Sequence, residues 1–281
     1  MLTQEKIEHF SEYFGVDLSA PLKKHSHLKN PDKSLVISDL HSPYHEKSLF
    51  EQTIKDNTDC KDVILPGDAA DFYSMSHYRK SVNAEFRDEF RGLHSALSDL
   101  SANFDNVYFM LSNHDTRLLK YMYDKVPEKL LPLLDVDLLP DLLKTIPNLT
   151  LCKQNTKYDF KLEYIWQYRD VIFTHVEQSS VDIGKVVQEI AKKLPKWEYT
   201  YNLRPYRAIF QGHNHISCKI KYNEKVWLYQ LPCMIDYSSF AFDYTRAGRL
   251  QGNPPALGHA VLEWTDNKFN PNKSYIYDYE V

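Results

Sequence analysis

The sequence has few of the residues that build flexible linkers and covalent crosslinks. Only 8 of its 281 residues are glycine, and no stretch rich in glycine, serine or proline divides the chain. This predicts one domain over residues 1–281 rather than two domains joined by a linker. The four cysteines include no Cys-x-x-Cys pair, which favours buried or idle thiols over a zinc knuckle or a disulfide framework.

Long apolar runs and an excess of positive charge are also missing. The most apolar stretch, 130–143, is broken by two prolines and three aspartates, so neither a membrane span nor a membrane partner is expected. The first residues are charged and include no apolar segment, which predicts no signal peptide and a cytoplasmic protein. The net charge of −4 offers no general attraction to nucleic acid, although a local basic groove is compatible with it.

Apolar and aromatic residues are plentiful and regularly spaced. They make up 43% and 14% of the chain, which is enough for a substantial core. Strands alternate with helices in the first half, and strands dominate the second half. The pattern predicts an α/β (α+β) fold of two stacked mixed sheets with flanking helices. The expected helices are 4–14, 46–56, 86–100, 117–123 and 183–194, and the expected strands are 34–38, 62–65, 106–111, 148–152, 161–167, 170–174, 207–211, 216–222, 226–231, 258–264 and 274–279.

Polar residues follow directly after five of these apolar runs. Ligands of open sheets bind outside the strand ends, so the five positions predict one shared site. The residues there that could bind a metal or move a proton are Asp39 and His41, Asp68, Asn113 with His114 and Asp115, His175, and His213 with His215.

Asp39 and His41 illustrate why a metal is expected. They are one residue apart, so in an extended chain their side chains point the same way. A carboxylate oxygen and an imidazole nitrogen together suit manganese, iron or zinc. A single Asp-x-His is more often a hydrogen-bonded turn, but the recurrence of such residues after four further runs favours a metal site.

These motifs resemble those of the calcineurin-like metallophosphoesterase superfamily. The resemblance covers about residues 34–235, with residues 1–32 as an N-terminal extension. It implies a four-layer αββα sandwich that holds two divalent metal ions at the strand ends. Manganese is favoured, with iron, zinc, nickel and magnesium as alternatives. The motifs are Asp39-x-His41, Gly67-Asp68-x-x-Asp71, Asn113-His114-Asp115, a lone His175 after a strand, and Gly212-His213-x-His215.

The resemblance also implies a role for each motif residue. Asp68 would bridge the two metals, and His114 would contact the phosphate or the leaving-group oxygen. Asp71 would orient His114, because such a histidine needs a partner that fixes its tautomer. The remaining ligands would be Asp39, His41 and His215 for the first metal and Asn113, His175 and His213 for the second.

The resemblance implies a hydrolase, and the chemistry of such a site explains the residue types. Two metals clamp the attacking and leaving oxygens of a phosphoryl displacement, and a hydroxide between them is a nucleophile near neutral pH. We therefore expect a metal-dependent phosphoesterase that hydrolyses a phosphate mono- or diester, with a nucleotide or a nucleic-acid end favoured. The alternatives are a non-catalytic metal-binding scaffold and a protein phosphatase of the same fold. The protein-phosphatase branch typically has Arg-Gly where this chain has Phe72-Tyr73, which disfavours that branch.

The chain departs from the family pattern at two positions. Ser112 stands where the family usually has glycine, which predicts a modest backbone adjustment. Val176 and Glu177 follow His175 where a glycine is common, and Glu177 could either support the site or be a surface carboxylate.

Two positions and one segment are candidates for substrate contact. Arg117 lies one helical turn after His114, so it either contacts phosphate or is an exposed helix arginine. Tyr44 could stack on a base or another ring. A leucine-rich insertion of short helices, about 124–147, either lies near the site or extends the core.

Overall fold

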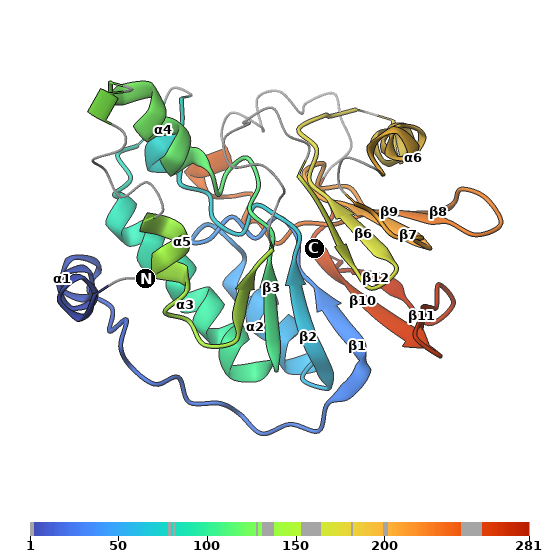
Figure 1. Cartoon of the computed structure of the whole chain (residues 1–281), viewed down its shortest axis with the longest axis horizontal. Coiled ribbons are helices and arrows are strands. Elements are labelled where there is room, and N and C mark those ends of the chain that lie inside the picture. Colours follow the sequence, from blue (N-terminus) through green and yellow to red (C-terminus); the bar gives the residue numbers. More distant parts are fainter. Residues whose placement is uncertain are drawn as a thin grey trace.

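Two mixed β-sheets packed face to face form the centre of the structure, with helices on both outer sides (Figure 1). It is a computed structural model of the chain. It describes residues 3–77, 80, 82–127, 129–130, 138–152, 164–180, 182–198, 202–242 and 255–280. No helix in these ranges is both long enough and apolar enough to cross a membrane.

The first sheet has a parallel centre. Its order is β11-β10-β1-β2-β3-β4, and β12 also pairs with β10. Strands β1 to β4 run parallel, so their carboxyl ends meet at one edge, while β10 joins antiparallel to β1. The strands are β1 (Asn30–Val36), β2 (Cys60–Leu65), β3 (Asn106–Phe109), β4 (Leu149–Leu151), β10 (Gly258–Thr265), β11 (Lys268–Phe269) and β12 (Tyr275–Asp278).

The second sheet repeats this arrangement on a smaller scale. Its order is β5-β6-β7-β9-β8, with β6, β7 and β9 parallel and one antiparallel strand at each edge. The carboxyl ends of β6 and β7 again lie at one edge. The strands are β5 (Ile165–Tyr168), β6 (Val171–Thr174), β7 (Ala208–Gln211), β8 (Cys218–Lys221) and β9 (Trp227–Gln230).

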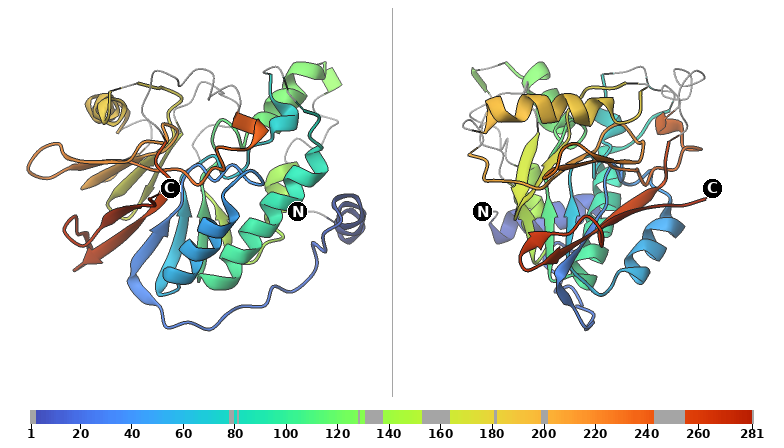
Figure 2. Two further views of the ribbon diagram at one scale, coloured as in Figure 1. Left: turned by 180° about the vertical axis from the view of Figure 1, so that it is seen from behind. Right: turned by 90° about the vertical axis from the view of Figure 1, so that its right-hand side faces the viewer.

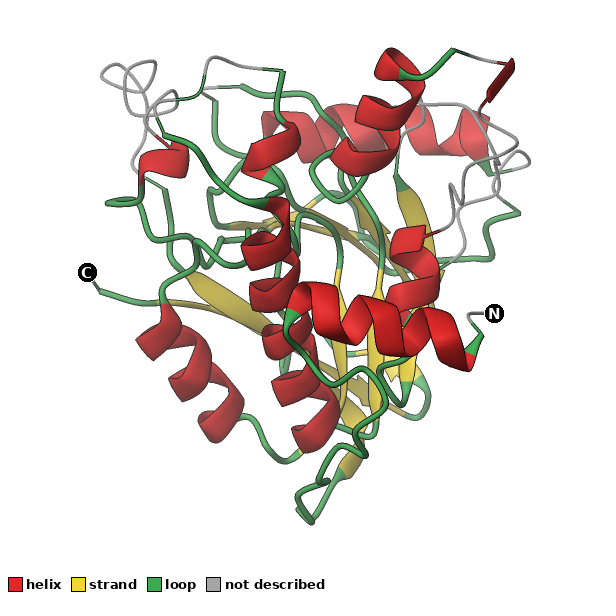
Figure 3. Ribbon diagram, turned by 90° about the vertical axis from the view of Figure 1, so that its left-hand side faces the viewer, coloured by secondary structure: helices red, strands yellow, loops and turns green. Residues whose placement is uncertain are grey.

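The helices complete the outer layers. Helices α2 (Lys47–Asp56), α3 (Phe86–Asn103) and α5 (Leu138–Leu143) pack against the first sheet, and α6 (Lys185–Trp197) packs against the second (Figures 1 and 2). Helix α1 (Gln4–Phe14) lies across α3 on the outside (Figure 3), where the rings of Phe14 and Phe90 are 4.1 Å apart. Helix α4 (Arg117–Lys125) follows β3, beyond the strand ends.

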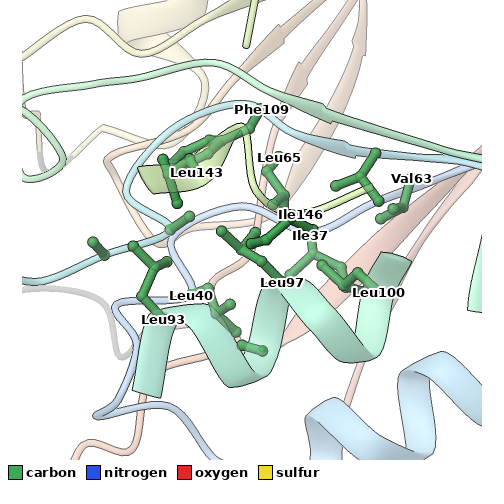
Figure 4. Packing of buried hydrophobic residues seen from close by; sticks show 14 of the residues in the cluster. Ile37, Leu40, Val63, Leu65, Leu93, Leu97, Leu100, Phe109, Leu143 and Ile146 are labelled. Carbon is green, nitrogen blue, oxygen red and sulfur yellow. The ribbon is translucent and has the colours of Figure 1, made fainter. Parts of the chain in front are cut away.

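Alternating side chains along the strands build the layers. In β6, Val171 and Phe173 face the core between the sheets, whereas Ile172 faces α6. In β2, Ile64 faces the other sheet, whereas the neighbouring Leu65 belongs to the cluster that packs against α3, together with Leu97 (Figure 4). Burying each large apolar side chain contributes about 1.5–3 kcal/mol. The expected four-layer sandwich of two mixed sheets with flanking helices is confirmed.

The expected elements match the structure with a few exceptions. Ile183 was expected at the start of a helix, but α6 begins at Lys185 and Ile183 is 54% exposed. The reason is Gly184, whose φ of 78° is not helical, so the helix can begin only after this residue. The short strand β11 was not expected. Residues 161–163 and part of the insertion, 128 and 131–137, lie outside the described residues. The single-domain division with its extension stays a prediction.

Candidate metal centre

The loops that follow β1 and β2 run side by side. The backbone N–H of His41 donates to the carbonyl of Asp68 at 2.8 Å, and that of Ser42 donates to Ala69 at 2.8 Å. A parallel bridge between Ser42 and Ala70 continues the pairing beyond the sheet. The two loops therefore hold Asp39 and His41 in register with Asp68.

Most of the candidate ligands sit on an unusual backbone. The φ angles of Asp39, His41, Asp68, His213 and His215 lie between 49° and 74°, in the left-handed region. Such conformations cost non-glycine residues about 1–3 kcal/mol each and persist where the surroundings enforce them, often at functional sites. Asp39 and His41 do converge, but the extended chain expected to bring them together is replaced by these two left-handed turns.

Asp39, His41 and His215 form one group whose potential ligand atoms all lie within 4.8 Å of one another. The distance from Nε2 of His215 to Oδ1 of Asp39 is 3.0 Å. Nδ1 of His41 lies 2.7 Å from Oδ2 of Asp71, so Nδ1 carries the proton. Nε2 of His41 is then an acceptor that faces the carboxylates of Asp39 and Asp68, at 4.0 and 3.7 Å.

Asp68, His175 and His213 form a second group of the same size. Nδ1 of His175 donates to the carbonyl of Pro66 at 3.0 Å, which turns Nε2 towards Oδ2 of Asp68, also at 3.0 Å. The rings of His175 and His213 are edge to face, with centroids 5.5 Å apart. The two groups are contiguous, because Nε2 of His175 is also 3.8 Å from Oδ1 of Asp39.

Three buried atoms of the candidate ligands have no hydrogen-bond partner among the residues that the structure describes. They are Nε2 of His41, Nε2 of His175 and Oδ1 of Asn113. Buried polar atoms are nearly always paired, so these unpaired atoms need an explanation. An amide oxygen and the Nε2 atoms of neutral imidazoles are ligands that divalent manganese, iron and zinc accept, and cation binding would displace any proton from Nε2 of His175. The residues present therefore fit a divalent cation.

His114 lies beside this cluster and is held by two charged residues. Its Nδ1 is 3.3 Å from Oδ2 of Asp71, and its Nε2 is 3.1 Å from Nη2 of Arg117. Arg117 also donates through Nη1 to the carboxylate and the carbonyl of Asp71, both at 2.9 Å. Burial and the charge of Arg117 lower the pKa of His114 to about 4. Asp71 is thus shared between His41 and His114, and the expected pairing of Asp71 with His114 is present in the geometry.

Charge is concentrated in the cluster. Burial disfavours the charged imidazole, but the carboxylates of Asp68 and Asp39 raise the pKa of His175 to about 9. Burial and the charge of His175 lower the pKa of His213 to about 3. Burial would raise the pKa of Asp39, yet His175 and His215 hold it below its usual range. Without a cation, protonated His175 therefore compensates part of the carboxylate charge.

The glycines of the motifs make room for His175. A Cβ on Gly67, whose φ is 117°, would lie 2.4 Å from Nδ1 of His175. A Cβ on Gly212 would lie 2.7 Å from the same atom. Real Cβ atoms do not approach this closely, so any larger residue at either position would displace the imidazole.

Tyr44 and Glu177, the other two residues that were considered for the site, contact protein side chains. The hydroxyl of Tyr44 donates to Oε1 of Glu89 at 3.2 Å, and its half-buried ring packs edge-on against Phe240. Glu177 is 49% exposed and lies 3.5 Å from Nζ of Lys120, which makes it a surface carboxylate.

Asp115 was a candidate for the site from its place in a motif, but the sequence predicted no specific role for it. Its buried carboxylate accepts hydrogen bonds from the backbone N–H groups of Asp68, Ala70 and Ser112, at 2.8–2.9 Å. Asp115 thereby joins the loops that follow β2 and β3. Its position next to His114 was visible in the sequence, but its three partners depend on how the loops meet.

No family model matches the sequence, and no curated protein matches it. Similar solved structures include a metallophosphoesterase from Sphaerobacter thermophilus, 13% identical, with 89% of each chain covered and a TM-score of 0.44. A dimetal phosphatase from Danio rerio is 9% identical, with 89% of this chain and 100% of that chain covered and a TM-score of 0.43. A predicted phosphoesterase from Streptococcus pneumoniae is 12% identical, with coverages of 88% and 98% and a TM-score of 0.33.

Proposed function

We propose that this protein is a phosphoesterase that uses two divalent metal ions, manganese by preference, to hydrolyse a phosphate mono- or diester. One observation carries the proposal. Nε2 of His41 and Nε2 of His175 are buried beside the carboxylates of Asp39 and Asp68 and, like the buried Oδ1 of Asn113, have no hydrogen-bond partner among the described residues. This is the donor set that the motif resemblance implies.

Asp68 is the proposed shared ligand. Its Oδ2 lies 3.7 Å from Nε2 of His41 on one side and 3.0 Å from Nε2 of His175 on the other. The first cation would be held by Asp39, His41, Asp68 and His215, and the second by Asp68, Asn113, His175 and His213. Bound there, the cations would supply positive charge to the phosphate oxygens and lower the pKa of water.

The remaining charged residues would act on the substrate. Asp71 faces Nδ1 of His114, which leaves Nε2 as the edge of the ring that can meet the leaving-group oxygen. We propose that His114 carries a proton to that oxygen, once an arriving phosphate draws Arg117 away from Nε2 and removes the charge that helps to lower the pKa of His114. Arg117 is anchored to Asp71 and places Nη2 beside Nε2 of His114, where it could bind a phosphate oxygen as that oxygen arrives.

The nature of the substrate is part of the proposal. A nucleotide or a nucleic-acid end remains the favoured class, and Tyr44 its predicted stacking partner. The net charge of −4 supports a small substrate over long duplex DNA, since duplex binding depends on phosphate neutralisation by cationic residues. A cytoplasmic location stays a prediction.

A substrate panel tests the proposal. Metal-free protein reconstituted with Mn²⁺ is assayed on a nitrophenyl phosphate monoester, its diester, a nucleotide and an oligonucleotide. We expect at least one to be hydrolysed, and we expect both chelator and the Asp68→Asn variant to abolish the activity. Two bound Mn²⁺ ions without hydrolysis of any substrate would instead support the non-catalytic scaffold. No bound Mn²⁺ would overturn the metal site itself.

A further inference from the structure

A lysine of helix α4 reaches from the first sheet to the second. Lys120 follows Arg117 by one helical turn, and its Nζ lies 3.5 Å from Oε1 of Glu177, in the loop that follows β6. A second contact lies nearby, where Oγ1 of Thr116 is 3.3 Å from the hydroxyl of Tyr164, directly before β5. Lys120 therefore bridges loops of the two sheets on the side of the molecule that carries the candidate ligands.

The cations Arg117 and Lys120 are held very differently. The side chain of Arg117 is 11% exposed, and its Nη1 donates to the carboxylate and the carbonyl of Asp71, both at 2.9 Å. The side chains of Lys120 and Glu177 are 23% and 49% exposed, and their separation exceeds that of an ordinary charged hydrogen bond. Such exposed ion pairs contribute little to stability. An anion with more charge than a carboxylate would therefore displace Glu177 from Lys120.

The position of Lys120 along α4 indicates what this anion is. Residues three apart lie on one side of a helix, with Cβ atoms about 5–6 Å apart. Arg117 places Nη2 3.1 Å from Nε2 of His114, the atom that we propose faces the leaving-group oxygen. Lys120 lies one turn farther on, at the end of a long and flexible side chain. A phosphate on the leaving group would come within its reach.

We propose that Lys120 is a specificity-determining residue that binds a second phosphate, carried by the leaving group, and that Glu177 holds Lys120 until this phosphate arrives. The inference rests on the proposed function and narrows its substrate class to esters with two phosphate groups. Hydrolysis would break the bond between the scissile phosphorus and the leaving-group oxygen. Water gives its hydroxyl to phosphorus and a proton to that oxygen, and the leaving group keeps its own phosphate.

Binding of two phosphonate analogues tests the proposal without relying on catalysis. The first is derived from adenosine bisphosphate, which has a phosphate on each of two sugar hydroxyls, and a methylene group replaces the scissile ester oxygen. The second analogue lacks the other phosphate. Each is titrated calorimetrically into Mn²⁺-loaded protein. We expect Lys120→Gln to weaken binding of the two-phosphate analogue about tenfold, as for one charged hydrogen bond, and to leave the other unchanged. Lys120→Arg should keep most of the affinity.

Glu177 distinguishes substrate binding from a structural ion pair. Glu177→Gln removes the competing carboxylate, so the two-phosphate analogue should bind more tightly, and this gain should vanish in the double variant with Lys120→Gln. A structural ion pair would instead weaken binding in both single variants. The controls are Lys125→Gln, exposed in the last turn of α4, and Glu189→Gln, whose carboxylate pairs with Lys192 on α6. Neither control should change either affinity.

A second pair of analogues identifies the source of the leaving group. They are derived from a dinucleotide with a terminal phosphate, in one case with and in the other without the phosphate that joins the two nucleosides. Dependence on Lys120 with the adenosine bisphosphate analogue indicates a free nucleotide as substrate. Dependence with the dinucleotide analogue alone indicates a nucleic-acid end. Both results support a second phosphate at Lys120.

The outcomes separate this inference from the proposed function. If the protein binds Mn²⁺ and the one-phosphate analogue, but Lys120→Gln weakens both members of each pair equally or weakens neither, only the role of Lys120 fails. Weaker binding of the two-phosphate analogue by Glu177→Gln also contradicts that role. If wild-type protein binds no Mn²⁺, or binds Mn²⁺ but none of the analogues, the proposed function fails together with the inference.

Discussion

The two sheets contribute to the site in chemically different ways. The loops after β1, β2 and β3 bring all the carboxylates, and one of these, Asp115, joins two loops by accepting their backbone N–H groups. The loops after β6 and β7 bring only imidazoles, and an amide, that of Gln211, joins them. Its Nε2 donates to the carbonyls of Val176 and Gly212, at 3.2 and 2.8 Å.

The negative charge of the site therefore lies on the side of the first sheet. Each sheet has to hold two strand-end loops together, and both use a buried side chain for this purpose. In the first sheet that side chain adds negative charge next to Asp68. In the second sheet it is neutral, so His175 and His213 meet the carboxylates only across the interface between the sheets. In the proposed metal site, the first sheet would thus supply the attraction for a cation and the second would complete its coordination.

Substituting one histidine from the loops of each sheet should give the largest effects. His114→Ala removes a proposed proton donor but no proposed ligand, so metal content should stay near two while kcat falls by roughly 10²–10⁴. The loss should be greater for an alkyl leaving group than for nitrophenolate, which departs without a proton. His213→Ala removes a ligand, so metal content and activity should fall together. Elemental analysis and kcat on both kinds of substrate provide the measurement.

Excess Mn²⁺ separates the two variants. It should partly restore His213→Ala and leave His114→Ala unchanged. If His114→Ala loses metal, or keeps its rate on the alkyl substrate, the proposed division between catalyst and ligand is wrong.

The next largest effect should be a loss of stability when the amide of Gln211, in the second sheet, is exchanged for an acid. In Gln211→Glu a carboxylate oxygen replaces the N–H donor and faces the carbonyls of Val176 and Gly212. A buried acceptor without a donor destabilises, and ionisation would add a further cost, so we expect a loss of at least about 3 kcal/mol. Chemical denaturation measures it, with Gln52→Glu as control because Gln52 is exposed on α2. Equal stability of both variants would contradict the role assigned to Gln211.

The pH dependence of metal-free protein should expose the contact between the sheets. Burial opposes the charged form, but the carboxylates of Asp68 and Asp39 raise the pKa of His175 to about 9, above the value of 6.5 for a free imidazole. The resulting stability is complete below pH 6.5 and is lost between pH 6.5 and 9. The raised pKa corresponds to about 3 kcal/mol. Denaturation in chelator across this range measures the loss.

Bound metal and a variant of His175 provide the controls. A ligating imidazole must be neutral, so Mn²⁺ displaces the proton and the decline above pH 6.5 should disappear. The melting temperature should also be higher in Mn²⁺ than in chelator, because the metal binds only the folded state. His175→Gln should flatten the metal-free profile. The same slope with and without Mn²⁺ would contradict this account.

Periodicity and strand-end positions predicted the layers and the candidate ligands, because both depend on local sequence. The left-handed backbone at Asp39 was not predicted, since it is enforced by pairing with the neighbouring loop. The contacts of Ser112 and of Asp115 with Asp68 were also missed, because Asp68 lies more than 40 residues away along the chain. The hydrogen bond from the hydroxyl of Tyr44 to Glu89 of α3 was also not predicted, because only tertiary structure brings Glu89 near, and stacking of the Tyr44 ring on a substrate stays a prediction.

The reverse exchange in the first sheet, from the acid of Asp115 to an amide, should have the smallest effect. Asp115→Asn should therefore destabilise the protein less than Gln211→Glu. One oxygen can still accept the N–H groups of Asp68 and Ser112, and only Ala70 loses its acceptor. Burial and the charge of Asp68 raise the pKa of Asp115 to about 7, so removing the charge relieves a repulsion that offsets the lost hydrogen bond. We expect a net loss of about 1 kcal/mol in chelator, measured by chemical denaturation with exposed Asp88→Asn as control. A loss as large as that of Gln211→Glu would mean that the charge of Asp115 is needed for folding, and the proposed difference between the two sheets would fail.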